Sequence, residues 1–158
     1  MLSNRINHRG TAVSFMLALG VAAAACVSLP AAAARDGPLY EVTITNATFG
    51  QQFTPLLLVT HRSQVKLFEI GTTASAGLAT LAEEGNVDPL RQVLDADPHV
   101  NMTAAGAGLT NPGTTVTLMV RGHPLRDRLS VAAMLIPTND AFVALNSVAL
   151  PLHGSETY

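Results

Sequence analysis

The stretch of sequence that decides the fold is LSVAAMLIPTNDAFVALN, which runs from Leu129 to Asn146. It consists of two apolar runs joined by the polar corner PTND at residues 137–140. Pro137 ends the first run because proline has no N–H to give to a sheet and fixes its own φ angle. Asparagine and aspartate are typical of turns, since their short side chains bond to nearby backbone groups. The stretch therefore predicts two strands and a corner that presents the Asp140 carboxylate at the rim of a sheet.

Strand patterns also occur before this stretch. Residues 40–46 and 114–120 alternate between apolar and polar side chains, which predicts half-buried strands. Residues 56–60 form a short apolar run that predicts a buried strand, and residues 129–136 are apolar nearly throughout, as in a central strand covered on both faces. Residues 102–112 show no periodicity and are expected to form a loop. Several short strands separated by turn signals indicate an all-β sandwich.

Two short helices are expected inside this chain of strands. In residues 73–85 the apolar side chains of Ala74, Leu78 and Leu81 recur at helical spacing, with Thr73 or Ser75 as the cap and Gly85 as the stop. A second helix is expected to begin with Asp88 as its N-cap and Pro89 as its first residue. Its predicted inner face consists of Leu90, Val93 and Leu94.

The first 34 residues have the pattern of a secretory signal peptide. Residues 1–9 carry two arginines and no acid, residues 11–25 are apolar and small, and alanines fill positions 31–34. We expect cleavage after Ala34, so that residues 35–158 form the mature domain in a secreted or periplasmic location. A membrane-spanning helix is the alternative, but such a helix needs about twenty strongly apolar residues, and this run is shorter and rich in alanine.

Cys26 is the only cysteine. With the three alanines before it, Cys26 resembles a bacterial lipoprotein processing site, where the cysteine carries a lipid anchor, although Ala23 stands where such sites usually have leucine. With cleavage after Ala34 the mature chain has no cysteine, hence no disulfide and no thiolate metal site. Both alternatives stay open at this point, and neither leaves a transmembrane span in the mature protein.

Charge and composition argue against several classes of function. Removing Arg5 and Arg9 from the nine Lys and Arg leaves seven against eleven Asp and Glu, a net charge of −4. Nucleic-acid binding needs clustered basic side chains, so no nucleic-acid partner is expected. The histidines show no zinc-ligand spacing and the chain has no Gly-x-Ser-x-Gly elbow. We therefore expect no enzymatic activity.

Three segments together resemble the spondin N-terminal domain, a family known from F-spondin, mindin and many short secreted bacterial proteins. They are the strand at residues 40–46, the helix at 74–85 with its ASAG start and AEEG end, and the strand–PTND–strand unit that begins at Leu129. The resemblance spans about residues 39–150. It implies a C2-like antiparallel β-sandwich of eight strands, non-enzymatic roles in matrix contact and adhesion, and a divalent cation, usually calcium, at the loops of one end.

The resemblance makes Asp140 the candidate metal ligand, because it matches the carboxylate of the family's Pro-x-x-Asp corner. Asn139 is a second candidate, and the Thr138 hydroxyl offers a further oxygen. Calcium takes six to eight oxygen ligands, so this corner alone supplies a partial site. The family continues with a further strand and an acidic loop that this chain lacks before Tyr158, which predicts a missing last strand and an incomplete cation site.

The sequence thus predicts a secreted binding module that contacts an unknown extracellular, envelope or matrix component, with calcium as a candidate cofactor. The alternative is a truncated periplasmic structural fragment that binds no ligand. Enzymatic activity would need a pocket with convergent polar groups, which the sequence does not indicate.

Overall fold

The computed structural model of the protein describes residues 36–158. The predicted signal peptide, its cleavage site after Ala34 and Cys26 lie outside the described residues. Among residues 36–158, no helix is long and apolar enough to cross a membrane.

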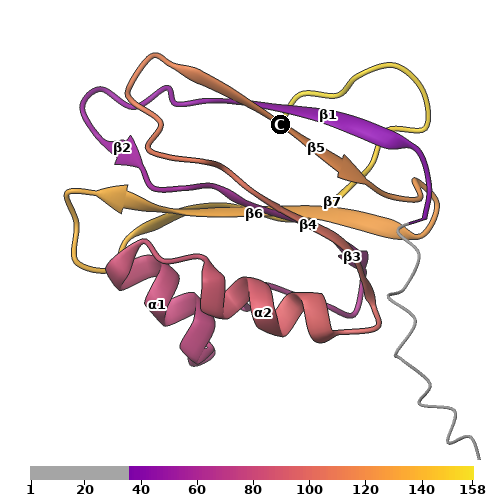
Figure 1. The fold of residues 1–158 in the computed structure, drawn as a ribbon, viewed down its shortest axis with the longest axis horizontal. Helices are drawn as coiled ribbons and strands as arrows, with labels where there is room; N and C mark the ends of the chain where they lie inside the picture. The colour runs from indigo at the N-terminus through magenta and orange to yellow at the C-terminus, as the bar shows by residue number, and fades with distance from the viewer. Residues whose placement is uncertain (1–35) are drawn as a thin grey trace, which may run out of the picture. The chain divides into compact units, whose positions relative to one another are not determined.

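The described residues form seven strands and two helices in two antiparallel sheets, so the predicted all-β sandwich with inserted helices is confirmed (Figure 1). The smaller sheet pairs β1 with β5, and the larger has the order β2-β6-β3-β4 with β7 on the other side of β6. The elements are β1 (Leu39–Thr45), β2 (Gln52–Phe53), β3 (Leu57–Arg62), α1 (Ala76–Glu84), α2 (Asp88–Ala96), β4 (Val100–Ala105), β5 (Thr115–Arg121), β6 (Asp127–Ile136) and β7 (Phe142–Ala149).

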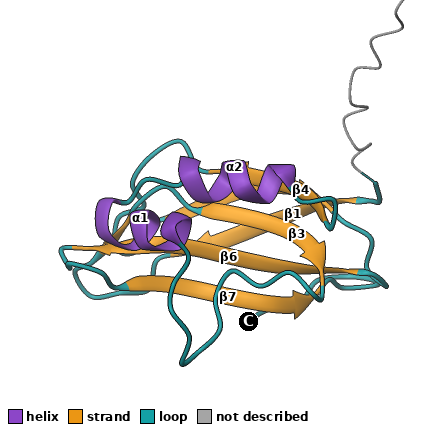
Figure 2. Ribbon diagram, turned by 90° about the horizontal axis from the view of Figure 1, so that it is seen from below, coloured by secondary structure: helices purple, strands orange, loops and turns teal. Residues whose placement is uncertain are grey.

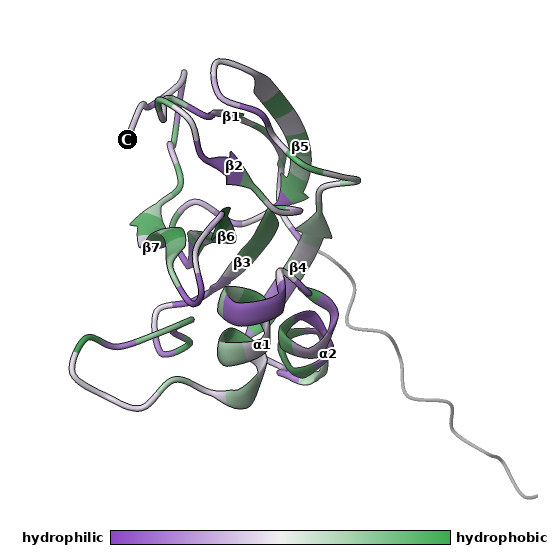
Figure 3. Ribbon diagram, turned by 90° about the vertical axis from the view of Figure 1, so that its left-hand side faces the viewer, coloured by the Kyte–Doolittle hydropathy of each residue, from purple (hydrophilic) through white to green (hydrophobic). Residues whose placement is uncertain are grey.

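The large sheet lies between two covering layers. The helices α1 and α2 cover one of its faces (Figure 2), and the β1–β5 pair covers the other (Figures 1 and 3). Strands at the centre of such an arrangement are buried on both faces and need apolar side chains at every position. In β6, residues 129–134 are all buried, and they are apolar with the single exception of Ser130. The sequence prediction of a doubly covered central strand is therefore confirmed.

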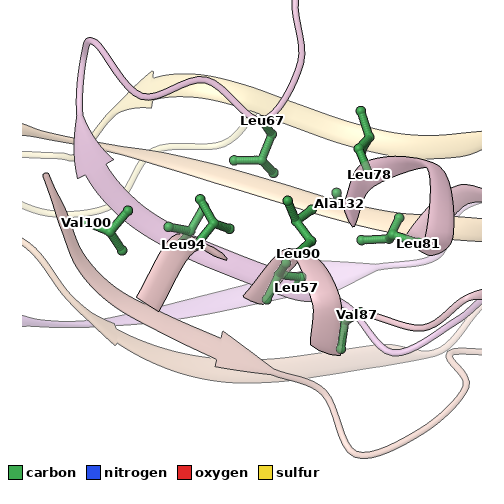
Figure 4. Close-up of a cluster of buried hydrophobic side chains, with 10 residues drawn as sticks. Leu57, Leu67, Leu78, Leu81, Val87, Leu90, Leu94, Val100 and Ala132 are labelled. Carbon is green, nitrogen blue, oxygen red and sulfur yellow. The ribbon is translucent and has the colours of Figure 1, made fainter. Parts of the chain in front are cut away.

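Alternation along the central strands divides the core into two clusters. Leu57, Val59 and Ala132 face the helices, where they pack with Leu81 and Leu90 (Figure 4). The intervening residues Leu58, Val131 and Ala133 face the β1–β5 pair and belong to the second cluster. Because successive side chains of a strand point to opposite faces, one short apolar run supplies both clusters.

The helix α1 has the caps that the sequence predicts, although Ala74, predicted on its apolar face, lies before the helix and is exposed. The Ser75 hydroxyl accepts a hydrogen bond from the Leu78 N–H over 3.2 Å, so Ser75 rather than Thr73 is the N-cap. Gly85 ends the helix in the left-handed conformation, at φ 69°, and its N–H donates to the Leu81 carbonyl. A residue with a side chain is strained there, and a Cβ at Gly85 would also lie 2.5 Å from the Thr54 methyl carbon.

Two details predicted for α2 are wrong. Asp88 is the first helical residue rather than the N-cap, which is Val87, and the Asp88 N–H is bound by the Asn86 side chain. Val93 is 67 % exposed, whereas Leu90 and Leu94 are buried. Helix periodicity allowed Val93 at the edge of the apolar face, but α1 and the sheet cover only the side of α2 that carries the two leucines.

The predicted loop at residues 102–112 is wrong in its first part, because residues 102–105 belong to β4 and pair with β3. This segment lacks strand alternation since its buried position is polar. Thr103 is 2 % exposed, and its hydroxyl donates to Asp95 Oδ1 over 2.6 Å and accepts from Arg91 Nε over 3.2 Å. A strand whose inward side chain bonds to a helix does not produce an apolar pattern in the sequence.

Candidate binding surface at the loop end

Three loops gather at one end of the sandwich, and we call this region the loop end. They are residues 46–51 between β1 and β2, residues 106–114 between β4 and β5, and the corner 137–141 between β6 and β7 (Figure 1). The first two are joined by a hydrogen bond from Asn46 Nδ2 to the Thr110 carbonyl, 2.9 Å long. The corner follows directly on Ile136, which pairs with Gln52 of β2.

The loop at residues 46–51 is held by the fully buried side chain of Asn46. The Asn46 amide group donates to the Gln51 carbonyl over 2.7 Å as well as to Thr110, and its Oδ1 accepts from the N–H and the hydroxyl of Thr48, at 3.0 and 2.7 Å. Each hydrogen-bonding group of this amide has a partner, so the loop is fixed from below by side-chain to backbone bonds. The sequence alone does not predict this arrangement.

Phe49 lies at the tip of this fixed loop and is 107 % exposed, more than any other described apolar side chain. Leu109 on the neighbouring loop is 54 % exposed. A hollow of about 220 Å³ opens beside Leu109 and is lined by Leu56, Thr110 and Val116 among others. Exposed large apolar side chains gathered on one surface are typical of interaction sites.

The predicted metal ligands Asp140 and Asn139 lie at the same end, and both are exposed. The Thr138 hydroxyl fixes their corner, donating to the Leu135 carbonyl over 2.6 Å and accepting from the Ala141 N–H over 3.2 Å. Within residues 36–158, no group of three or more His, Cys, Asp or Glu side chains is placed to hold a metal ion. The corner thus presents Asp140 as a carboxylate without acidic companions in the described part of the chain.

The opposite end of the domain carries most of the charged contacts. Asp127 is almost fully buried there, and its Oδ2 accepts from Asn101 Nδ2 and from the His123 N–H, both over 2.8 Å. Its Oδ1 lies 3.5 Å from Arg62 Nε. Nearby, Arg126 bonds to Asp36 over 2.6 Å and, through this bond, lowers the pKa of the Asp36 carboxyl. These contacts tie β3, β4, β6 and the segment before β1 together.

A serine and a histidine meet in the core. Ser130 Oγ and His61 Nε2 are 2.8 Å apart, and His61 Nδ1 lies 2.8 Å from the Arg62 carbonyl, which can only accept a hydrogen bond. Nδ1 therefore carries the proton and Ser130 donates to Nε2, while Ser130 Oγ accepts from the Ser147 N–H. Burial lowers the pKa of His61. Both side chains are fully buried, so the pair cross-links β3, β6 and β7 and faces no substrate.

The described fold is a two-sheet antiparallel sandwich whose Ser–His pair is sealed in the core. Its loop end holds an exposed aromatic side chain on loops that are fixed by hydrogen bonds. The family model for the spondin N-terminal domain matches residues 43–156. The chain therefore belongs to the spondin N-terminal domain family, which consists of non-catalytic, extracellular-type modules. No curated protein matched the chain.

Proposed function

We propose that this protein is an adhesion-type binding module of the extracellular space or cell envelope, which contacts a protein or matrix component through its loop end. It reaches this place as a secreted or periplasmic protein after cleavage behind Ala34. The observation that carries the proposal is the fully exposed Phe49 ring on a loop fixed by Asn46.

Energetics support Phe49 as the principal contact. Burial of an aromatic ring against a partner removes apolar surface from water, which contributes favourable binding free energy. Aromatic side chains are accordingly enriched among the residues that dominate binding free energy. A loop that is already fixed loses little conformational freedom on binding, so more of this gain remains as affinity. The uncharged loops around Phe49, residues 46–51 and 106–114, favour a partner whose contact surface is apolar or neutral.

We expect Phe49→Ala to weaken binding by about tenfold or more, in line with the loss of a central aromatic contact. The protein is tested by surface plasmon resonance against immobilised fibronectin, collagen, heparin and isolated bacterial envelope. The matched control is Leu125→Ala, which removes a 76 % exposed apolar side chain from the turn before β6, at the opposite end of the domain. This control should bind like the unchanged protein.

Two results would contradict the proposal. One is the lack of saturable binding to any of these surfaces, which would favour the alternative of a structural fragment without a ligand. The other is saturable binding that Phe49→Ala and Leu125→Ala weaken equally, which would move the contact away from the loop end.

Calcium binding at the corner is a second proposal, supported by the family membership and by the exposed carboxylate of Asp140. Asp140 and Asn139 supply the first oxygens, and water or a carboxylate of the partner completes the shell. Few protein ligands give low affinity, so a dissociation constant on the order of 1 mM is expected, as in weak extracellular calcium modules. The ion would hold the corner and bridge it to the partner.

We expect calcium at millimolar concentration to raise the melting temperature of the protein slightly and to leave the Asp140→Ala variant unchanged. The control is Glu41→Ala, which removes an exposed carboxylate from β1 and should keep the calcium response. Differential scanning calorimetry and isothermal titration measure both effects. A flat titration of the unchanged protein, or an equal calcium response in Asp140→Ala, would remove the cation from the proposal.

A further inference from the structure

Among residues 36–158, no strand pairs with the outer edge of β1. Asn46 donates its N–H to the Thr114 carbonyl and the Pro38 carbonyl accepts from the Gly122 N–H, so the backbone groups of even-numbered residues point to β5. The register between β1 and β5 shows no shift. Backbone groups alternate in direction along a strand, and those of residues 39, 41, 43 and 45 therefore point outward. Within the described chain, these outward groups make no hydrogen bond.

This edge lacks the features that normally protect edge strands. Proteins guard such edges with lysine, proline or a β-bulge, and β1 contains none of them. Four consecutive β-branched residues, 42–45, favour a flat and regular strand instead. The inner-face side chains of Val42 and Ile44 also remain partly exposed, although they pack on the core between the sheets.

We propose that β1 pairs with β1 of a second copy of this chain, antiparallel and with Thr43 opposite Thr43 of the other copy. In this register each outward-pointing residue meets another one, which gives about six hydrogen bonds between the strands. On the inner face, Val42 lies opposite Ile44 of the second copy and the reverse pair repeats this contact. Such pairs of β-branched side chains stabilise antiparallel strands. The pairing joins the two small sheets into one sheet of four strands.

The single charge on this edge disfavours a register that is shifted toward the N-terminal end of β1. Glu41 lies opposite Thr45 of the second copy, and the two Glu41 side chains are four residues apart along the strands, about 13 Å. This distance exceeds the Debye length at physiological salt. If the symmetry axis passed through Val42 instead, the two Glu41 side chains would be only two residues apart along the strands, about 7 Å. Their carboxylates would then repel each other more strongly.

The C-terminal residues 151–158 pass near β1 (Figure 3), where the Tyr40 hydroxyl donates to the Pro151 carbonyl over 3.1 Å. These residues make no hydrogen bond with the backbone of β1, and residues 152–158 are exposed. They can therefore move aside at small cost. The interface comprises one strand from each copy, so it is small, and we expect a weak dimer with a dissociation constant on the order of 100 μM.

Dimerisation also sets where the two loop ends lie, and its effect on binding rests on the proposed function. Because the paired strands run in opposite directions, the two loop ends point away from each other. A dimer can then hold one partner at each end and bridge two surfaces, with the gain in avidity that two linked sites provide.

Sedimentation equilibrium of the protein without any partner tests the pairing. Thr43→Lys places two lysines directly opposite each other in the dimer and should weaken association at least tenfold. The control is Thr117→Lys, since Thr117 is the neighbour of Thr43 on the same exposed face, with their hydroxyls 3.3 Å apart, but lies on β5. Association of the control should stay within about twofold of the unchanged protein.

A cross-link tests the register even if a lysine variant is unstable. In a Cys26→Ser background, Thr43→Cys should form a disulfide-linked dimer on oxidation, because residues opposite each other in a hydrogen-bonded pair have Cα atoms about 5.5 Å apart. Thr45→Cys should not, since its counterpart lies about 13 Å away.

A protein that is monomeric up to about 1 mM, equal weakening by both lysines, or equal cross-linking by both cysteines would overturn the proposal. Failure of Phe49→Ala to affect partner binding would overturn the binding surface and leave the dimer untouched.

Discussion

Replacement of Asp127 by alanine is expected to destabilise the protein by about 3 kcal/mol. The carboxylate is 2 % exposed and accepts two hydrogen bonds at 2.8 Å, from Asn101 and from the His123 N–H. Without Asp127 these donors lose their acceptor in a place that water reaches poorly. Arg62 loses its counter-charge as well, and the junction of β3, β4 and β6 becomes looser.

The control for this prediction is Asp36→Ala. Asp36 has the shorter ion pair, 2.6 Å to Arg126, but its side chain is 64 % exposed. Solvent screens such pairs, so the melting temperature of Asp36→Ala should lie close to that of the unchanged protein. Urea unfolding measured by circular dichroism compares the two variants. An equal decrease in the free energy of unfolding in both variants would show that burial does not determine how much each carboxylate stabilises the protein.

Replacement of Leu94 by alanine is expected to lower the free energy of unfolding by about 2–5 kcal/mol, the usual cost of a cavity in a tight core. Leu94 is 5 % exposed and belongs to the cluster between the helices and the sheet (Figure 4). Its neighbour Val93 is 67 % exposed, and Val93→Ala should change the free energy by less than about 0.5 kcal/mol.

These adjacent variants share one helix turn and differ mainly in what covers the side chain. Thermal unfolding followed by circular dichroism measures both free energies. If Val93→Ala lowered the free energy of unfolding as much as Leu94→Ala, the buried face of α2 would include Val93, as the sequence predicts, and the structure would be contradicted.

The sequence predicts elements best where one physical signal acts alone. Residues 40–46 alternate because one face of β1 is in water, and Ser75 and Gly85 mark α1 because helix ends need a cap and a left-handed residue. In β4 the alternation is lost because the buried Thr103 bonds to a helix instead of packing against apolar side chains. Helix periodicity places Val93 inward because it gives the direction of each side chain around the helix axis. It does not give how much of the helix surface the neighbouring elements cover.

The site shows the same division. The exposed position of Asp140 is predictable from the PTND corner, because turn residues and proline are local signals. The support of Phe49 could not be found, since Asn46 holds its loop through the Thr110 carbonyl, 64 residues away. Asp127 is equally hidden. In the sequence it is one acid in a polar turn, and besides the His123 N–H of that turn its partners are Arg62 and Asn101, which lie far away in the chain.

By itself the sequence determined that strands and two short helices form, where most of them lie, and that the PTND corner joins two buried strands, because hydrophobic periodicity, caps and proline act within a few residues. Only the tertiary structure decided which strands pair, which side chains are covered, that the loop end exposes Phe49, and that no strand of the described chain pairs with the outer edge of β1. These features depend on contacts between residues far apart in the chain, and no local pattern specifies them.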